Sequence, residues 1–254
     1  METITKNQRV IFNLCSSEEE IVQKITDRVI SLVNSNPSCN LGLSFSMPLI
    51  PVYHSLVFDY NTNKTNYSNV RTYNLSEFIS SSPLKWTFRK IMNRSFFSFM
   101  NIKSKNIFFP YYTSNYETAK YDRLIWKNGG IDLQLLVVER DGYIAYQEAN
   151  ADPNNLTSVT LVSKELRERT IPLFGETIDE TPETVVTMGI RTMLNSKSII
   201  MIADDKKALN ALVNLYKEKI NPAQPCTYFA QHPNVTVFLS KNLSTLFKKN
   251  IGKK

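Results

Sequence analysis

The chain has 254 residues, of which 42% are hydrophobic, and its formal net charge at neutral pH is +7. This length supports one large α/β core, and no run rich in Pro, Gly or Ser divides it, so we predict a single domain over residues 1–254. No uncharged apolar run approaches the roughly 18 residues that a membrane span needs, and Met1–Asn13 lacks the apolar core of a signal peptide. These features exclude an integral membrane protein and favour a cytoplasmic one.

The cysteines and the excess of basic residues do not point to a particular partner. Cys15, Cys39 and Cys226 are scattered and odd in number, which favours reduced thiols over a disulfide framework or a metal site. The one dense group of lysines lies in the last seven residues, where it is typical of a solvated tail. Aromatic residues lie within apolar runs and suit a core better than a base-stacking surface. We therefore expect no metal, no nucleic-acid partner and no membrane partner.

The first half of the chain alternates between helical and extended patterns. An amphipathic helix is expected where Ile21, Ile25, Val29 and Val33 recur at helical spacing, with Ser16 or Ser17 as its N-cap. In chain order, the expected elements are helix Glu18–Val33, strand Asn40–Phe45, helix Pro48–Val57, strand Ser68–Leu75, helix Lys85–Phe99 and strand Asn101–Phe109.

The second half contains three strongly apolar runs. Ile131–Val138, Ser198–Ala203 and Val235–Ser240 have the composition of strands that are buried on both faces, and Ala208–Lys219 is helical between the last two. Strands that alternate with helices predict an α/β fold with a doubly wound, mostly parallel sheet flanked by helices. Sites in such folds lie at the carboxyl ends of the strands, so we look for chemistry in the loops after Leu43, Leu75, Val138 and Ala203.

One of these loops carries a family resemblance. The segment GGIDLQLLVVERDGYIAYQEAN, from Gly129 to Asn150, resembles the glucosamine-6-phosphate deaminase/isomerase pattern of a strand followed by Asp-Gly-His-Ile-Ala-Phe-Asn-Glu-Pro. The positions in register are Asp141, Gly142, Ile144, Ala145 and Glu148, with Tyr146 and Gln147 as mild replacements.

Other stretches resemble the same family in the same order. Pro182–Leu194 is similar to Pro-x-x-Ala-Leu-Thr-Met-Gly-Ile, and Lys207 with the two residues after it is similar to the Gly-x-x-Lys-Ala motif. Upstream, Tyr73–Phe78 resembles Phe-Asn-x-Asp-Glu-Tyr, and Gly42–Pro48 lies where a Gly-x-Thr-Gly-x-Thr-Pro loop is expected. The resemblance implies a Rossmann-like fold and conversion of glucosamine 6-phosphate to fructose 6-phosphate and ammonia, without metal or organic cofactor.

The catalytic positions implied by the resemblance are partly substituted here. The family uses a carboxylate to move the C2 proton to C1, and that position aligns with Ser76, whose hydroxyl needs an activating base of its own. Neighbouring Glu77 has a carboxylate, but it points to the opposite side of an extended segment. The family histidine for ring opening aligns with Tyr143, a weak base near neutral pH. His54 and His232 align with neither position.

The remaining family positions concern the phosphate and the carboxylates of the loop. Gly42, Ser44, Ser46 and Lys207 are the candidates for binding the phosphate, although Ser44 and Ser46 also suit an ordinary strand-to-helix turn. Asp141 and Glu148 are catalytic by resemblance; Asp141 is equally compatible with a turn role, and for Glu148 a structural role as a cap is favoured because its histidine partner is replaced. Arg167 and Arg169 follow, with no assigned position.

Three functions are compatible with this sequence. The favoured one is a divergent family member that binds a hexosamine 6-phosphate with reduced or lost catalysis, because base and histidine positions are both changed. The alternatives are an active hexosamine-phosphate isomerase or deaminase with a rearranged site and a hydrolase of the 6-phosphogluconolactonase type. The sequence leaves the oligomeric state open.

Overall fold

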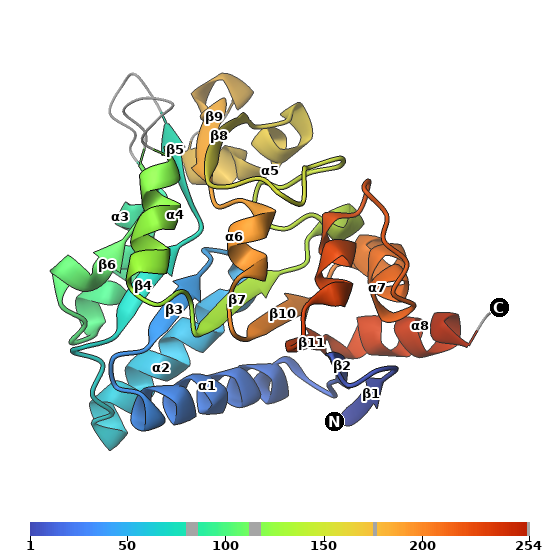
Figure 1. Cartoon of the computed structure of the whole chain (residues 1–254), viewed down its shortest axis with the longest axis horizontal. Coiled ribbons are helices and arrows are strands. Elements are labelled where there is room, and N and C mark those ends of the chain that lie inside the picture. Colours follow the sequence, from blue (N-terminus) through green and yellow to red (C-terminus); the bar gives the residue numbers. More distant parts are fainter. Residues whose placement is uncertain (80–85, 112–117, 175–176, 253–254) are drawn as a thin grey trace.

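A computed structural model describes residues 1–79, 86–111, 118–174 and 177–252 (Figure 1). Within these ranges the chain forms an eight-stranded sheet in the order β1-β2-β11-β10-β7-β3-β4-β6, in which every pairing is parallel except β1 with β2. The strands are β1 (Glu2–Thr5), β2 (Val10–Leu14), β3 (Asn40–Leu43), β4 (Arg71–Asn74), β6 (Ile107–Phe108), β7 (Leu133–Val137), β10 (Ile199–Ala203) and β11 (Val235–Leu239). The predicted doubly wound, mostly parallel fold is confirmed.

Helices cover both faces of this sheet. Leu135 of β7 packs in the same cluster as α1 (Glu18–Ser35) and α2 (Ile50–Asn63), whereas Leu136 packs on the other face. That second face is covered by α4 (Thr118–Lys127), α6 (Ile190–Leu194), α7 (Leu209–Tyr216) and α8 (Lys241–Ile251). Successive strand residues point to opposite faces, so a strand between two helical layers is apolar throughout, as all five residues of β10 are.

A second, three-stranded antiparallel sheet lies at the carboxyl edge of the first. It has the order β5-β9-β8, with β5 (Ser76–Ile79), β8 (Ser158–Leu161) and β9 (Thr184–Thr187). Only Leu75 separates β4 from β5, so the chain passes directly from one sheet to the other. Helices α3 (Phe88–Ser95) and α5 (Lys164–Phe174) lie next to this small sheet (Figure 1). The small sheet therefore lies over the strand ends where a site is expected.

Several boundaries differ from the sequence-based expectations. The predicted helix over Pro48–Val57 begins with a 3-10 turn at Met47–Leu49 and continues to Asn63. Lys85, the expected start of the next helix, lies outside the described residues, and α3 begins at Phe88 after the N-cap Thr87. Of the strand expected over Asn101–Phe109, only β6 pairs with the sheet.

The N-terminal helix follows its sequence closely. Ser17 is the N-cap of α1, its side chain accepts a hydrogen bond from the backbone of Glu20, and three glutamates fill the first turn. Among the described residues, no helix is long and apolar enough to cross a membrane.

Candidate active site

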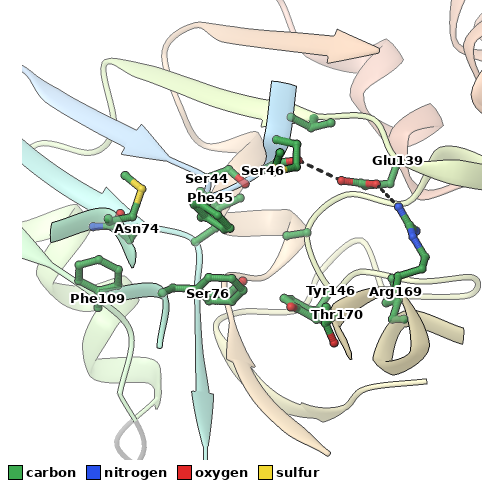
Figure 2. A pocket seen from close by; sticks show the side chains of 17 residues that line it. Ser44, Phe45, Ser46, Asn74, Ser76, Phe109, Glu139, Tyr146, Arg169 and Thr170 are labelled. Atoms are coloured by element: carbon green, nitrogen blue, oxygen red, sulfur yellow. Dashed lines mark hydrogen bonds and ion pairs between the residues drawn. The ribbon is translucent and has the colours of Figure 1, made fainter. Parts of the chain in front are cut away.

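A cavity of about 190 Å³ opens between the two sheets. Its walls come from the carboxyl ends of β3, β4 and β7 and from β5, α3 and α5 (Figure 2). Most of the lining is apolar, including Phe45, Leu75, Phe88 and Val137. The site therefore lies where the predicted topology places it, and polar side chains such as Ser44, Ser46 and Arg169 interrupt its mainly apolar wall.

The loop after β3 contributes two serines to this cavity. Ser44 is buried, and its carbonyl accepts a hydrogen bond from the hydroxyl of Tyr53 on α2 at 2.5 Å. Ser46 is half-buried and precedes the 3-10 turn that leads into α2, and its Oγ donates to Glu139 Oε1 at 3.2 Å. Both side chains point into the cavity region in Figure 2. Of the predicted phosphate contacts, these two line the cavity.

Gly42 and Lys207 lie elsewhere. Gly42 is inside β3, and a Cβ there would come within 2.1 Å of Gln134 Oε1, so the glycine allows a close approach between β3 and β7. Lys207 is exposed in the 3-10 turn after β10, where its backbone N–H donates to Asp205 Oδ1 at 2.8 Å. Neither residue is among the described side chains that line the cavity.

Ser76 and Glu77 face opposite sides of β5. Ser76 is buried at the cavity wall, and its hydroxyl hydrogen-bonds with Thr187 Oγ1 of β9 at 2.9 Å. The carboxylate of Glu77 instead accepts the backbone N–H groups of Phe88 at 2.9 Å and Arg89 at 3.0 Å, at the start of α3. Burial raises the pKa of Glu77 above its usual value. Its carboxylate is thus engaged in holding α3 beside the small sheet.

The loop that follows β7 is tightly folded. Asp141 and Ala145 both adopt left-handed backbone conformations, with φ of 56° and 53°. Gly142 lies between them at φ 80°, and a Cβ there would come within 2.6 Å of Ala211 on α7. This glycine allows the loop to pack directly onto α7, which turns Ala145 and Tyr146 into the cavity wall.

The other family positions of this loop, Asp141, Tyr143 and Glu148, are not among the described residues that line the cavity. Tyr143 is half-buried, and its pKa is raised by burial and then by the negative charge of Glu148, with Asp141 contributing less. Glu148 lines a separate groove beside β8, where its Oε1 accepts the backbone N–H of Ser163 at 3.4 Å. The structure brings these three residues into one electrostatic group, apart from Ser44, Ser46 and Ser76.

The histidines and cysteines take no part in the cavity. His232 is buried, and its ring hydrogen-bonds with the carbonyl of Ser196 at 2.7 Å and accepts the backbone N–H of Asn234 at 3.0 Å. His54 is exposed on α2. All three cysteines are free and buried.

An ion pair closes one end of the cavity and was not predicted from sequence. Arg169 of α5 donates to Glu139 Oε2 at 2.7 Å, and the other carboxylate oxygen accepts from Ser46 (Figure 2). Glu139 was visible as the charge that ends the apolar run of β7, but nothing local indicates that α5 would return to it. Two described charged side chains, Glu139 and Arg169, line this cavity.

This fold and this site, in the crevice at the carboxyl ends of a doubly wound sheet, define a Rossmann-like α/β protein of the deaminase and 6-phosphogluconolactonase type. Glucosamine-6-phosphate deaminase of a Geobacillus species is 32% identical to this chain over 235 residues, covering 90% of this chain and 92% of that protein. The Thermoanaerobacter pseudethanolicus deaminase is 30% identical over 235 residues, covering 90% and 91%. The chain belongs to the glucosamine-6-phosphate deaminase family.

Solved structures agree with this assignment. A monomeric glucosamine-6-phosphate deaminase superposes with a TM-score of 0.85 at 26% identity, covering 94% of this chain and 99% of that one. A 6-phosphogluconolactonase from Thermotoga maritima has a TM-score of 0.67 at 20% identity, covering 91% and 98%, and so shares the fold. No protein-family model matches the chain.

Proposed function

We propose that this chain is a divergent deaminase-family protein that binds a hexosamine 6-phosphate in the cavity between the two sheets, with reduced or lost catalysis. Membership of the family and the position of the cavity at the carboxyl strand ends support the binding part of this proposal. Ser44, Ser46 and Arg169 provide hydroxyls and a guanidinium, which are suitable partners for a sugar phosphate.

The main observation in support of lost catalysis is the environment of Ser76. Its hydroxyl stands at the position where the family has a proton-transferring carboxylate, and its hydrogen-bond partner is the hydroxyl of Thr187. A hydroxyl needs a neighbouring base to act at neutral pH, and a threonine is not one. The described carboxylate in the cavity wall, Glu139, is paired with Arg169.

The ring-opening group supports the same conclusion. Tyr143 replaces the family histidine, and burial together with the charge of Glu148 raises its phenol pKa further above neutrality. A group that titrates far above the working pH is a poor proton acceptor. Two roles of the family reaction thus lack a suitable base, and losses among groups that act together are not additive.

A thermal-shift titration with glucosamine 6-phosphate, fructose 6-phosphate and inorganic phosphate tests binding, and an ammonia-release assay on the same samples tests turnover. We expect stabilisation by glucosamine 6-phosphate without matching ammonia release. Ammonia release at the rate of an active relative measured in parallel would refute the loss of catalysis and favour the rearranged-site alternative. The absence of any shift with sugar phosphates would refute binding, and hydrolysis of 6-phosphogluconolactone would favour the lactonase alternative.

A gain-of-function variant sharpens the test. Ser76→Asp combined with Tyr143→His restores both missing groups, and Asp at position 76 keeps Thr187 as a hydrogen-bond partner. We expect the double variant to release ammonia faster than the wild type, while each single change gives less. The matched control is Ser104→Asp with Tyr143→His, which adds the same charge at an exposed position outside both the cavity and the groove beside β8. An equal gain in that control would contradict the role assigned to position 76.

A further inference from the structure

Both oxygens of the Glu139 carboxylate are used inside the cavity. Oε1 accepts the Ser46 hydroxyl at 3.2 Å, and Oε2 accepts the Arg169 guanidinium at 2.7 Å. These two donors come from segments far apart in the sequence, the loop after β3 and helix α5, and they converge on one carboxylate (Figure 2). The arrangement is a small anion site that an internal anion already fills.

The donors are those that a phosphate would use. A guanidinium binds the oxygens of phosphates and carboxylates in the same fork geometry, and a serine hydroxyl donates to either. Among the described lining residues, Arg169 is the sole cation, so a bound phosphate has no second cation to use in this cavity. A ligand phosphate and the Glu139 carboxylate therefore require the same two groups.

The surroundings make the competition stronger. Asp204, at the end of β10, has its pKa raised by burial, next by the charge of Glu139, and also by Asp205 and Glu18. Asp204 itself is exposed and outside the cavity lining. A phosphate dianion placed beside Arg169 meets the negative charge of Glu139, which is bound to the same guanidinium.

The ion pair is also free to open. The side chains of Glu139 and Arg169 keep 26% and 39% of their exposure, so water can solvate both groups when they separate. Partly exposed ion pairs of this kind are weakly held. Glu139 can therefore be displaced by a ligand, but the displacement weakens the observed affinity.

We propose that Glu139 determines the ligand specificity of this site, as an internal anion that competes with the ligand phosphate for Ser46 and Arg169. The inference deepens the proposed function and rests on it, because it concerns the same cavity. It predicts that the wild-type protein binds phosphorylated sugars weakly and discriminates little between them and their unphosphorylated forms. Removing the charge of Glu139 converts the cavity into a phosphate-selective site.

Isothermal titration calorimetry at pH 8 tests this, because a phosphate monoester with a second pKa of about 6 is then a dianion. The ligands are glucosamine 6-phosphate, glucosamine and inorganic phosphate, and the proteins are wild type, Glu139→Gln and Glu139→Ala. We expect both variants to bind glucosamine 6-phosphate about tenfold tighter or more, which corresponds to about 1.4 kcal/mol or more. Affinity for unphosphorylated glucosamine should stay within about twofold of wild type.

A matched control exists on the same helix. Glu183 pairs with Arg167 of α5 at 2.8 Å, outside the cavity, so Glu183→Gln removes the same charge from an ion pair of the same helix, while Arg167 keeps its hydrogen bonds to Thr181 and Ile178. We expect no gain in phosphate affinity from Glu183→Gln. Adding Arg169→Gln to Glu139→Gln should abolish the gain, because the remaining donor is a neutral hydroxyl.

The outcomes separate the two proposals. If the wild type binds glucosamine 6-phosphate and the Glu139 variants bind it no tighter, the role of Glu139 is refuted and the proposed function stands. If only the Glu139 variants bind, the role of Glu139 is supported and sugar-phosphate binding by the natural protein is refuted. If no folded variant binds, both proposals fail. If Glu183→Gln binds glucosamine 6-phosphate as much more tightly as Glu139→Gln does, the higher affinity comes from the more positive net charge of the protein. The specific role of Glu139 is then refuted.

Discussion

Replacing Glu77 by alanine is expected to destabilise the protein because its carboxylate holds the first turn of α3. The two oxygens accept the backbone N–H groups of Phe88 at 2.9 Å and Arg89 at 3.0 Å, and that of Phe78 at 3.0 Å. The first N–H groups of a helix have no partner within the helix, so removing the carboxylate leaves them unpaired. The adjacent cap by Thr87 remains, since it binds a different N–H, that of Lys90.

Hydrogen bonds to charged groups contribute about 1.5–3 kcal/mol each, and an N-cap about 0.5–2 kcal/mol. Arg89 is exposed, so water can take the place of the carboxylate as the acceptor for its backbone N–H. We therefore expect a total loss of about 2–3 kcal/mol of unfolding free energy. For a chain of this size, 1 kcal/mol shifts the melting temperature by about 2–4 °C, which predicts a fall of roughly 4–12 °C. Glu77→Gln should lose less, because it keeps one acceptor and buries no charge.

Thermal and urea unfolding followed by circular dichroism, with ammonia release measured in parallel, test this reasoning. The control Glu168→Ala removes an exposed carboxylate with one 3.9 Å ion pair and should change stability by less than about 0.5 kcal/mol. A Glu77→Ala protein that melts like the wild type would refute the capping role. If the wild type releases ammonia and Glu77→Gln does not, although both proteins are equally stable, Glu77 would instead be the catalytic base.

Three further perturbations have defined outcomes. Gly42→Ala should cost about 1–3 kcal/mol because its Cβ meets Gln134, and Gln134→Ala in the same chain should recover most of that loss in urea unfolding. Asp122→Ala should cost about 2–4 kcal/mol, because the buried carboxylate accepts Thr157 Oγ1 at 2.8 Å and also the hydroxyl of Thr192; wild-type stability in this variant would contradict the network. Burial raises the pKa of Asp122, so the folded protein holds this proton more tightly than the unfolded chain; its contribution is greatest below about pH 4 and falls as pH rises through the folded-state pKa. Asp122→Asn should therefore gain stability relative to wild type as urea unfolding is repeated from pH 4 to 7, and a constant difference would refute the shift.

The central sheet was largely predictable because its strands carry strong local signals. β10 is five apolar residues in succession, and β7 and β11 are each interrupted by a single polar residue, Gln134 and Thr236, so all three have the composition of strands that lie between two helical layers. β2, which joins the sheet beside β11, was not predicted although four of its five residues are apolar and only the buried Asn13 is polar. Its composition is as apolar as that of β7, but the hydrogen bond from Thr3 of β1 to Asn13, which pairs the two N-terminal strands, has no local sequence signal.

The small antiparallel sheet and the site's ion pair were not predictable for a related reason. β8 and β9 have four residues each, and Thr187 of β9 gains its hydrogen-bond partner, Ser76, from β5, 111 residues earlier in the chain. The expectation that sites lie at the carboxyl ends of parallel strands was sufficient to place Ser44, Ser46 and Ser76 near one another. It could not indicate that Arg169 returns to Glu139 from a helix 30 positions later, since that depends on the docking of the whole small sheet.

Proton exchange at C2 of bound glucosamine 6-phosphate tests the central claim most directly, because removal of that proton is the step assigned to the family carboxylate. The ligand is incubated with the protein in deuterium oxide at a concentration that saturates the calorimetric titration, and its C2 proton signal is followed by NMR. We predict that the signal persists in the presence of wild-type protein and decays with the Ser76→Asp, Tyr143→His variant. Rapid loss of the C2 proton signal with the wild type would contradict the account.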